Sequence, residues 1–164
     1  MKKNQLALQL YTLRDFLKTP AEIAVSLAKV KKIGYDVVQV SGMGAIDEAE
    51  LVKICKNEGL TICATHENGR MIVEETQKVI DRLHKLNTKY TAYPFPHVIP
   101  TNVAETVALA KQLDTAAKTM AAAGLGLCFH NHDIEFTKLE NNRTILDMLY
   151  ANAPSLLGEI DTFW

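Results

Sequence analysis

The stretch FHNHDIEF, residues 129–136, concentrates side chains that can bind a metal ion or transfer a proton. His130, His132, Asp133 and Glu135 directly follow an apolar run that is typical of a buried strand. Zn, Mn, Co and Fe accept neutral imidazoles and carboxylates, whereas Mg or Mn prefers the carboxylates. A divalent ion held there could polarise a carbonyl or hydroxyl oxygen of a substrate. The alternative is that these residues only hydrogen-bond the loops at a strand end.

Polar residues also follow other predicted strands. Side chains alternate between the two faces of a strand, so Glu159 and Asp161 share a face of the last one. The same rule places His130 and His132 on one side if their strand stays extended. His66, in the stretch CATHEN, follows the third strand and is a candidate for binding a hydroxyl or moving a proton. Its alternative is an exposed loop residue.

The elements that position these residues alternate between strand and helix. Apolar runs rich in β-branched or aromatic residues predict strands at 6–12, 36–41, 60–65, 90–93, 125–130 and 156–160. Helical patterns between them predict helices at 19–34, 47–59, 72–86, 102–123 and 144–152. The first helix has the clearest start, because Thr19 and Glu22 fit a capping box with Pro20 at the first helical position.

Repeated βα units predict a parallel sheet covered by helices, either open or closed into a barrel. The turn after the first strand has no glycine-rich phosphate-binding pattern, which disfavours a dinucleotide-binding sheet. Polar residues instead gather at the C-terminal ends of several strands, where a (β/α) barrel builds its active site. The sequence therefore predicts an α/β fold of the TIM-barrel type in a single domain, residues 1–164.

The predicted barrel is incomplete, with about six of the eight βα units, since a full barrel usually needs about 250 residues. We expect the chain to be truncated after the sixth strand. Strands at the ends of such a sheet have open edges. These edges would be covered by another chain, for which a homo-oligomer is one candidate, or rearranged, or left prone to aggregation.

Composition limits the partners. The chain of 164 residues has a formal net charge of -1, which argues against nucleic acid and fits a small, weakly charged substrate. No apolar stretch approaches the roughly 18 residues that a membrane span needs. Polar residues interrupt the N-terminal segment where a secretion signal would lie. Three cysteines without a CxxC pair suit a reducing compartment, so we expect a cytoplasmic protein.

Five segments together resemble the sugar phosphate isomerase/epimerase family of the xylose isomerase-like TIM barrels. The segments are QLYTLRD, IGYDVVQVSG, EGLTICATHEN, FHNHDIEF and EIDTFW, and they follow the family's order. The pattern HNHDxEF, followed by a strand that ends in DTxW, is the most specific of them.

The resemblance implies one bound divalent ion, often Mn or Mg and sometimes Zn or Co, and a small sugar or cyclitol substrate. By motif, Glu135 would be the first metal ligand and Asp161 the second. Glu135 and His132 would act in catalysis, while His66 and His130 would bind the substrate. The family's His and Glu ligands of the seventh and eighth strands have no counterpart in this sequence.

Three functions stay open. The first is a metal-dependent isomerase or epimerase of a sugar or sugar phosphate, in which a carboxylate such as Glu135 removes the proton next to a carbonyl. A dehydratase acting on a cyclitol or keto-sugar begins with the same step. The third is a non-catalytic barrel fragment or half-site subunit, so the sequence leaves open whether this chain is an enzyme.

Overall fold

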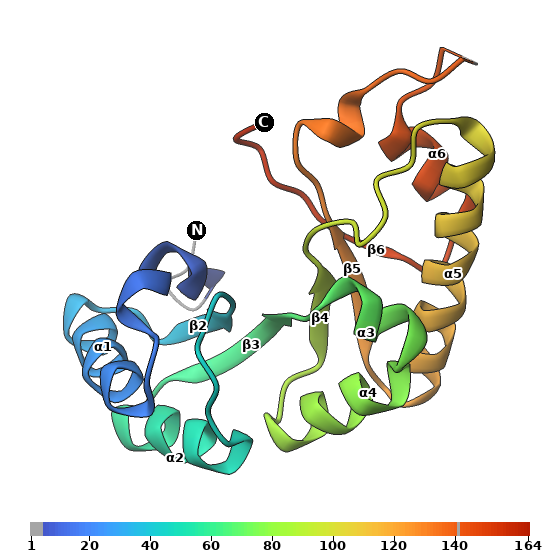
Figure 1. The fold of residues 1–164 in the computed structure, drawn as a ribbon. Helices are drawn as coiled ribbons and strands as arrows, with labels where there is room; N and C mark the ends of the chain where they lie inside the picture. Colours follow the sequence, from blue (N-terminus) through green and yellow to red (C-terminus); the bar gives the residue numbers. More distant parts are fainter. Residues whose placement is uncertain (1–4, 141) are drawn as a thin grey trace. The chain divides into compact units, whose positions relative to one another are not determined.

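The computed structural model describes residues 5–140 and 142–164. The sequence expectation about the N-terminal segment therefore falls partly on residues 1–4, outside this range. Strands alternate with helices along the chain, and the strands follow chain order in one sheet, from β1 to β6 (Figure 1). Their pairing is parallel. The predicted α/β class is confirmed. Among the described residues, no helix is both long and apolar enough to cross a bilayer.

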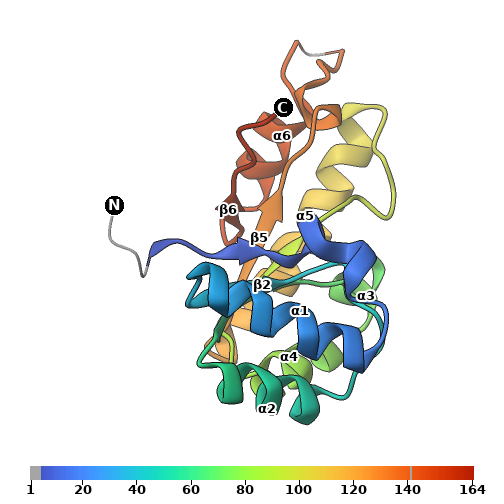
Figure 2. The same ribbon diagram turned by 90° about the vertical axis from the view of Figure 1, so that its left-hand side faces the viewer.

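Contacts divide the chain into two compact units. The first comprises the described residues up to His66 together with 81–90, and the second comprises 67–80 and 91–164 except residue 141. The first unit contains β1 (Leu8–Gln9), the 3-10 helix η2 (Leu10–Phe16), α1 (Pro20–Ile33), β2 (Val37–Val40), α2 (Glu48–Glu58) and β3 (Thr61–His66). Figure 2 shows the chain passing from β1 into η2 and on to α1.

The first unit has its own apolar core between the strands and the helices. Val38 of β2 is aligned with Leu8 of β1 and Ile62 of β3. Burying such side chains contributes roughly 1.5–3 kcal/mol each. The buried members are Leu10, Leu17, Ile23, Leu27, Val30, Val38, Val40, Leu51, Cys55, Leu60, Ile62 and Leu86.

The predicted start and end of α1 are confirmed. The Thr19 hydroxyl accepts a hydrogen bond from Glu22 N, and Glu22 Oε2 accepts one from Thr19 N at 2.9 Å. Gly34 then ends the helix with a φ of 118°, a backbone conformation that glycine adopts without steric cost. Local sequence therefore defines both ends of this helix.

The first strand is much shorter than the predicted 6–12, because the chain turns into η2 at Leu10. Thr12 Oγ1 donates to Gln9 O at 2.8 Å, and Arg14 Nη1 donates to Tyr11 O at 3.1 Å. These local bonds to backbone carbonyls compete with a strand ladder. Of the predicted strand at 6–12, only Leu8 and Gln9 are in the sheet, so the prediction was wrong at both of its ends.

The second unit carries the last two strands. It contains α3 (Gly69–Glu74), most of β4 (Tyr90–Tyr93), α5 (Val103–Ala122), β5 (Gly126–His130), the 3-10 helix η3 (Ile134–Phe136), α6 (Ile145–Asn152) and β6 (Leu157–Glu159). Helix α5 packs against both α6 and β5. The β5 and β6 strands pair from Cys128 with Leu157 to His130 with Glu159.

The helix predicted at 72–86 is two helices, α3 and α4 (Thr76–Lys85), separated at Glu75. The Asn68 side chain caps α3 by accepting from Arg70 N and Met71 N, so α3 begins earlier than predicted. At the break, Thr76 Oγ1 donates to Ile72 O at 2.7 Å. Thr115 makes the same bond inside the continuous helix α5, so this bond accompanies the break and does not by itself cause it.

Candidate metal centre

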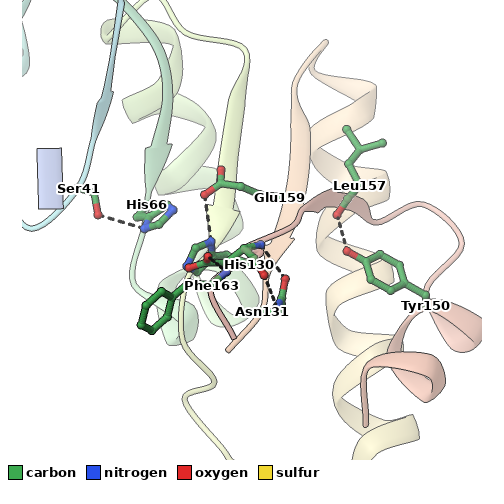
Figure 3. A network of polar contacts seen from close by, with 9 residues as sticks. Ser41, His66, His130, Asn131, Tyr150, Leu157, Glu159 and Phe163 are labelled. Carbon is green, nitrogen blue, oxygen red and sulfur yellow. Dashed lines mark hydrogen bonds and ion pairs between the residues drawn. The ribbon is translucent and has the colours of Figure 1, made fainter. Parts of the chain in front are cut away.

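Asp161 is held at the end of β5 by a buried amide. Asn131 is fully buried, and its Oδ1 accepts from Asp161 N at 2.9 Å. Its Nδ2 donates to Asp161 O at 3.1 Å (Figure 3). The two bonds continue the ladder past its last backbone pair, His130 with Glu159. The backbone of Asp161 is therefore fixed beside the strand end.

The carboxylate of Asp161 is oriented as well. Its Oδ1 accepts from Phe163 N at 2.9 Å, which forms a tight turn after β6. Its Oδ2 lies 3.8 Å from Nε2 of His130. One carboxylate oxygen of Asp161 therefore faces a ring nitrogen of the predicted substrate-binding histidine.

His130 lies between two carboxylates. Its Nδ1 is 3.3 Å from Oε1 of Glu159, while Nε2 faces Asp161 (Figure 3). The residue is 9% exposed. A ring nitrogen of His130 and a carboxylate oxygen of Glu159 are close enough to contact one cation. Sequence reasoning placed Glu159 on the same face as Asp161 but gave it no role.

Glu135 is the most deeply buried acid of this group, with 1% exposure. The chain leaves the strand conformation after His130 and forms η3, which contains Glu135. Its Oε2 accepts from His132 N at 2.6 Å, while Oε1 has no hydrogen-bond partner among the described residues. An ionised carboxylate without full compensation is costly to bury. A cation at Oε1 would remove this cost, so the residue fits the predicted metal-ligand role.

His132 lies just beyond the end of β5. The strand ends at His130, as predicted, so the condition under which His130 and His132 would share a strand face is not met. The ring of His132 nevertheless meets that of His130 edge-on, with 5.0 Å between centroids. It also contacts Phe95 at 5.4 Å and Trp164 at 5.6 Å.

The environment of His132 favours its neutral form. Burial, followed by the neighbouring His130, lowers the pKa of His132, and the surrounding carboxylates oppose this shift only in part. Its Nδ1 has no hydrogen-bond partner within the described part of the chain. A neutral imidazole can accept a proton or coordinate a metal ion.

The other histidines and Asp133 are more exposed than His130. His66 belongs to the first unit, where its Nδ1 is 3.0 Å from Ser41 Oγ (Figure 3). Its substrate-binding role stays a prediction. His97 Nδ1 is 2.8 Å from the hydroxyl of Tyr93, in the loop after β4. His84 and Asp133 are exposed.

Solved structures share this fold, although no family model and no curated protein matches the chain. A sugar phosphate isomerase/epimerase from Parabacteroides distasonis matches 97% of this chain and 69% of its own length, with a TM-score of 0.84 and 22% identity. D-psicose 3-epimerase from Clostridium cellulolyticum, solved with D-tagatose, matches 96% of this chain and 63% of its own length, with a TM-score of 0.61 and 14% identity. A probable 3-DHS dehydratase from Bacillus anthracis matches 94% of this chain and 62% of its own length, with a TM-score of 0.65 and 12% identity.

The chain has the fold of a partial xylose isomerase-like TIM barrel, which confirms the fold that its motifs implied. It spans between 62% and 69% of the length of the three proteins above. Identities of 12% to 22% show a common fold. The activity has to be argued from the site.

Proposed function

We propose that this chain binds a divalent ion, Mn or Mg, through Glu135 and Asp161 and serves as a sugar or sugar phosphate isomerase or epimerase. The observation that carries the proposal is the buried Glu135 carboxylate, whose Oε1 has no partner among the described residues. Asp161 supports it, because its Oδ2 lies 3.8 Å from Nε2 of His130, and both Glu135 and Asp161 act electrostatically on His132. Carboxylate oxygens are the ligands that Mg and Mn prefer, while Zn or Co would also accept the nearby imidazoles.

The bound ion would polarise the carbonyl oxygen of the substrate and so acidify the neighbouring carbon. Glu135, with its carboxylate buried beside that position, would remove the proton from this carbon. His132, held neutral by burial, would move a proton to or from a substrate oxygen. His66 and His130 would bind substrate hydroxyls. Phe95 and Trp164, whose rings both contact the ring of His132, would limit access of water.

Two alternatives are kept because each has its own support. A dehydratase acting on a cyclitol or keto-sugar would begin with the same proton abstraction, and a probable dehydratase shares the fold. A half-site subunit without activity of its own is favoured by the small number of carboxylate ligands, since a divalent ion usually binds about six ligand atoms.

We also propose that the protein is cytoplasmic, because its three cysteines form no CxxC pair.

Mn binding tests the site. Calorimetry on the full chain should show binding that weakens roughly tenfold or more in both Glu135→Gln and Asp161→Asn, because each change removes a charged ligand. Asp133→Asn is the matched control, since this exposed acid lies in the same motif and its substitution changes the charge equally. Equal affinity of all four proteins would contradict the proposed ligands.

Exchange of the substrate's carbon-bound proton tests the reaction. Keto-hexoses such as D-tagatose, in deuterated water with Mn, should incorporate deuterium next to the carbonyl, and Glu135→Gln should stop this. An isomerase or epimerase gives an isomeric sugar, whereas a dehydratase releases water and an unsaturated product. Mn binding without exchange in any keto-sugar or cyclitol would favour the half-site subunit.

A further inference from the structure

The loop after β4 contains a histidine whose ring is held by a tyrosine. The hydroxyl of Tyr93 accepts a hydrogen bond from the backbone N–H of His97 at 2.9 Å, and it lies 2.8 Å from Nδ1 of the same histidine. Tyr93 is fully buried, and its hydroxyl has no other hydrogen-bond partner among the described residues. A buried phenol that donates to nothing is costly, so the Tyr93 hydroxyl donates to Nδ1. His97 therefore carries its ring proton on Nε2.

The ring of Tyr93 has little freedom to move. It stacks on the ring of Phe129, with 5.6 Å between centroids. A side-chain carbon in place of the hydrogen of Gly69 would lie 2.7 Å from Cε2 of Tyr93, so the glycine lets the ring approach. Burial raises the pKa of Tyr93 to about 12, and the charge of Glu135 acts in the same direction. The phenol therefore keeps the proton that it donates to His97.

Two ring contacts connect this pair to the candidate metal centre. Phe95, two residues before His97, contacts the ring of His132, with 5.4 Å between centroids. Phe129, which stacks on Tyr93, belongs to β5, the strand that ends at the site. All of these residues lie in the second unit. The loop that carries His97 therefore borders the C-terminal ends of the strands, where a barrel binds its substrate.

We propose that His97 binds an oxygen of the sugar substrate through its Nε2–H, and that Tyr93 is the positioning residue that selects this tautomer and orients the ring. The inference rests on the proposed function and adds a residue to its substrate site. His97 is half-buried, and its Nε2 has no hydrogen-bond partner among the described residues. Because the ring is already held, binding a hydroxyl or carbonyl oxygen costs little orientational freedom.

A competing explanation is that the pair only stabilises the loop after β4. Two substitutions of His97 separate these roles. An asparagine amide reaches the position of Nδ1, so His97→Asn keeps an acceptor for Tyr93 and loses the outward donor. A glutamine amide reaches the position of Nε2, so His97→Gln keeps a donor there and loses the acceptor. Asparagine is the better replacement for a structural role, and glutamine for a binding role.

Nuclear magnetic resonance of the full chain, labelled with nitrogen-15 histidine, measures the tautomer. We expect the proton of His97 on Nε2 in the wild type and a mixture of tautomers in Tyr93→Phe, which removes only the hydroxyl. Tyr90→Phe is the matched control, because Tyr90 lies on the same strand and is 48% exposed. Addition of D-tagatose in the presence of Mg should shift the Nε2 signal of His97, and His97→Asn assigns that signal.

Deuterium incorporation into D-tagatose measures the effect on the reaction. In His97→Asn we expect KM to rise roughly threefold to tenfold with little change in kcat, because a hydrogen bond to an unreactive oxygen contributes equally to substrate and transition state. His97→Gln should recover part of this affinity. Tyr93→Phe should also raise KM, since the ring of His97 is then no longer held in one tautomer.

Other outcomes would overturn the inference. A ring proton on Nδ1 in the wild type would reject the role of Tyr93. Exchange with an unchanged KM in His97→Asn would remove His97 from the site and leave the proposed function standing, and a KM that rises only in His97→Gln would assign the pair to the loop. A shift at Nε2 without exchange would support His97 as a binding residue and reject the proposed reaction. Neither shift nor exchange would reject both.

Discussion

Asn131 shows how one buried residue can orient a neighbouring strand end. Both polar atoms of its amide bond the backbone of Asp161, and no part of the side chain is exposed. An amide has a donor and an acceptor at fixed positions, so it matches the donor and acceptor of a backbone residue as a strand partner would. The position of the Asp161 carboxylate therefore depends on Asn131.

The change Asn131→Asp keeps the shape and the acceptor, but it removes the donor and brings a negative charge to the carbonyl of Asp161. We expect a loss of about 1–3 kcal/mol in the free energy of unfolding. We also expect weaker Mn binding, because Asp161 would be displaced. Urea unfolding and calorimetry measure the two effects.

Asn152→Asp is the matched control, because Asn152 Nδ2 also donates to a carbonyl, that of Met148, at 2.8 Å. Its substitution should lower stability and leave Mn affinity unchanged. If Asn131→Asp behaved in the same way, Asn131 would support the fold without orienting the site.

Among the elements, helix starts depend on side chains close in sequence. Thr19, Asp47, Asn102 and Thr144 each cap the helix that follows, as their positions at predicted helix starts indicate. Such caps satisfy backbone N–H groups that have no partner within the helix. They can therefore be predicted from a few neighbouring residues.

Replacing the N-cap residue of α1 tests whether its side chain stabilises the start of the helix. In Thr19→Ala the hydroxyl that accepts from Glu22 N is lost, and we expect a decrease of about 1 kcal/mol in the free energy of unfolding. Thr119→Ala, at an exposed position inside α5, is the control. It should be neutral or stabilising, because alanine has the higher helix propensity. Urea unfolding compares them, and equal effects would mean that the cap contributes nothing specific.

The errors at the element scale have a common physical origin. Periodicity predicted β4 at its observed bounds, but it missed the break before Thr76 and the turn after Gln9. In both places a threonine hydroxyl bonds a backbone carbonyl nearby. Thr115 and Thr119 make the same kind of bond inside the unbroken helix α5, so the bond alone does not end an element, and packing elsewhere in the fold decides. A local pattern does not contain that information.

Some features of the candidate site could also be predicted from the sequence, and others could not. The family resemblance implied Glu135 and Asp161 as ligands, and the alternation rule placed Glu159 on the same strand face as Asp161. The role of Asn131 could not be predicted, because its partner lies 30 residues away in the sequence. The conformation after His130 could not be predicted either, and the strand does not continue through His132. These features depend on contacts between strands and turns.

At the scale of the whole molecule, the edge of β6 raises the question of a partner. The strand is last in the sheet order, and β5 is the strand paired with it among the described residues. Tyr150 donates to Leu157 O at 3.3 Å and so covers one carbonyl of β6 (Figure 3). The Leu157 side chain is 45% exposed and Ile160 is 58% exposed. An apolar edge strand is a template for pairing with another chain.

We therefore propose that copies of this chain associate through β6, one of the two sheet edges that a homo-oligomer could cover. Sedimentation velocity should give a mass above the 18.2 kDa of one chain for the wild type. Leu157→Lys should shift it toward 18.2 kDa, because a lysine on an edge strand opposes pairing. Ile33→Lys is the control, since Ile33 is 75% exposed at the end of α1. A wild type that sediments as one chain at every concentration would reject the association, and equal dissociation by both variants would place the contact away from β6.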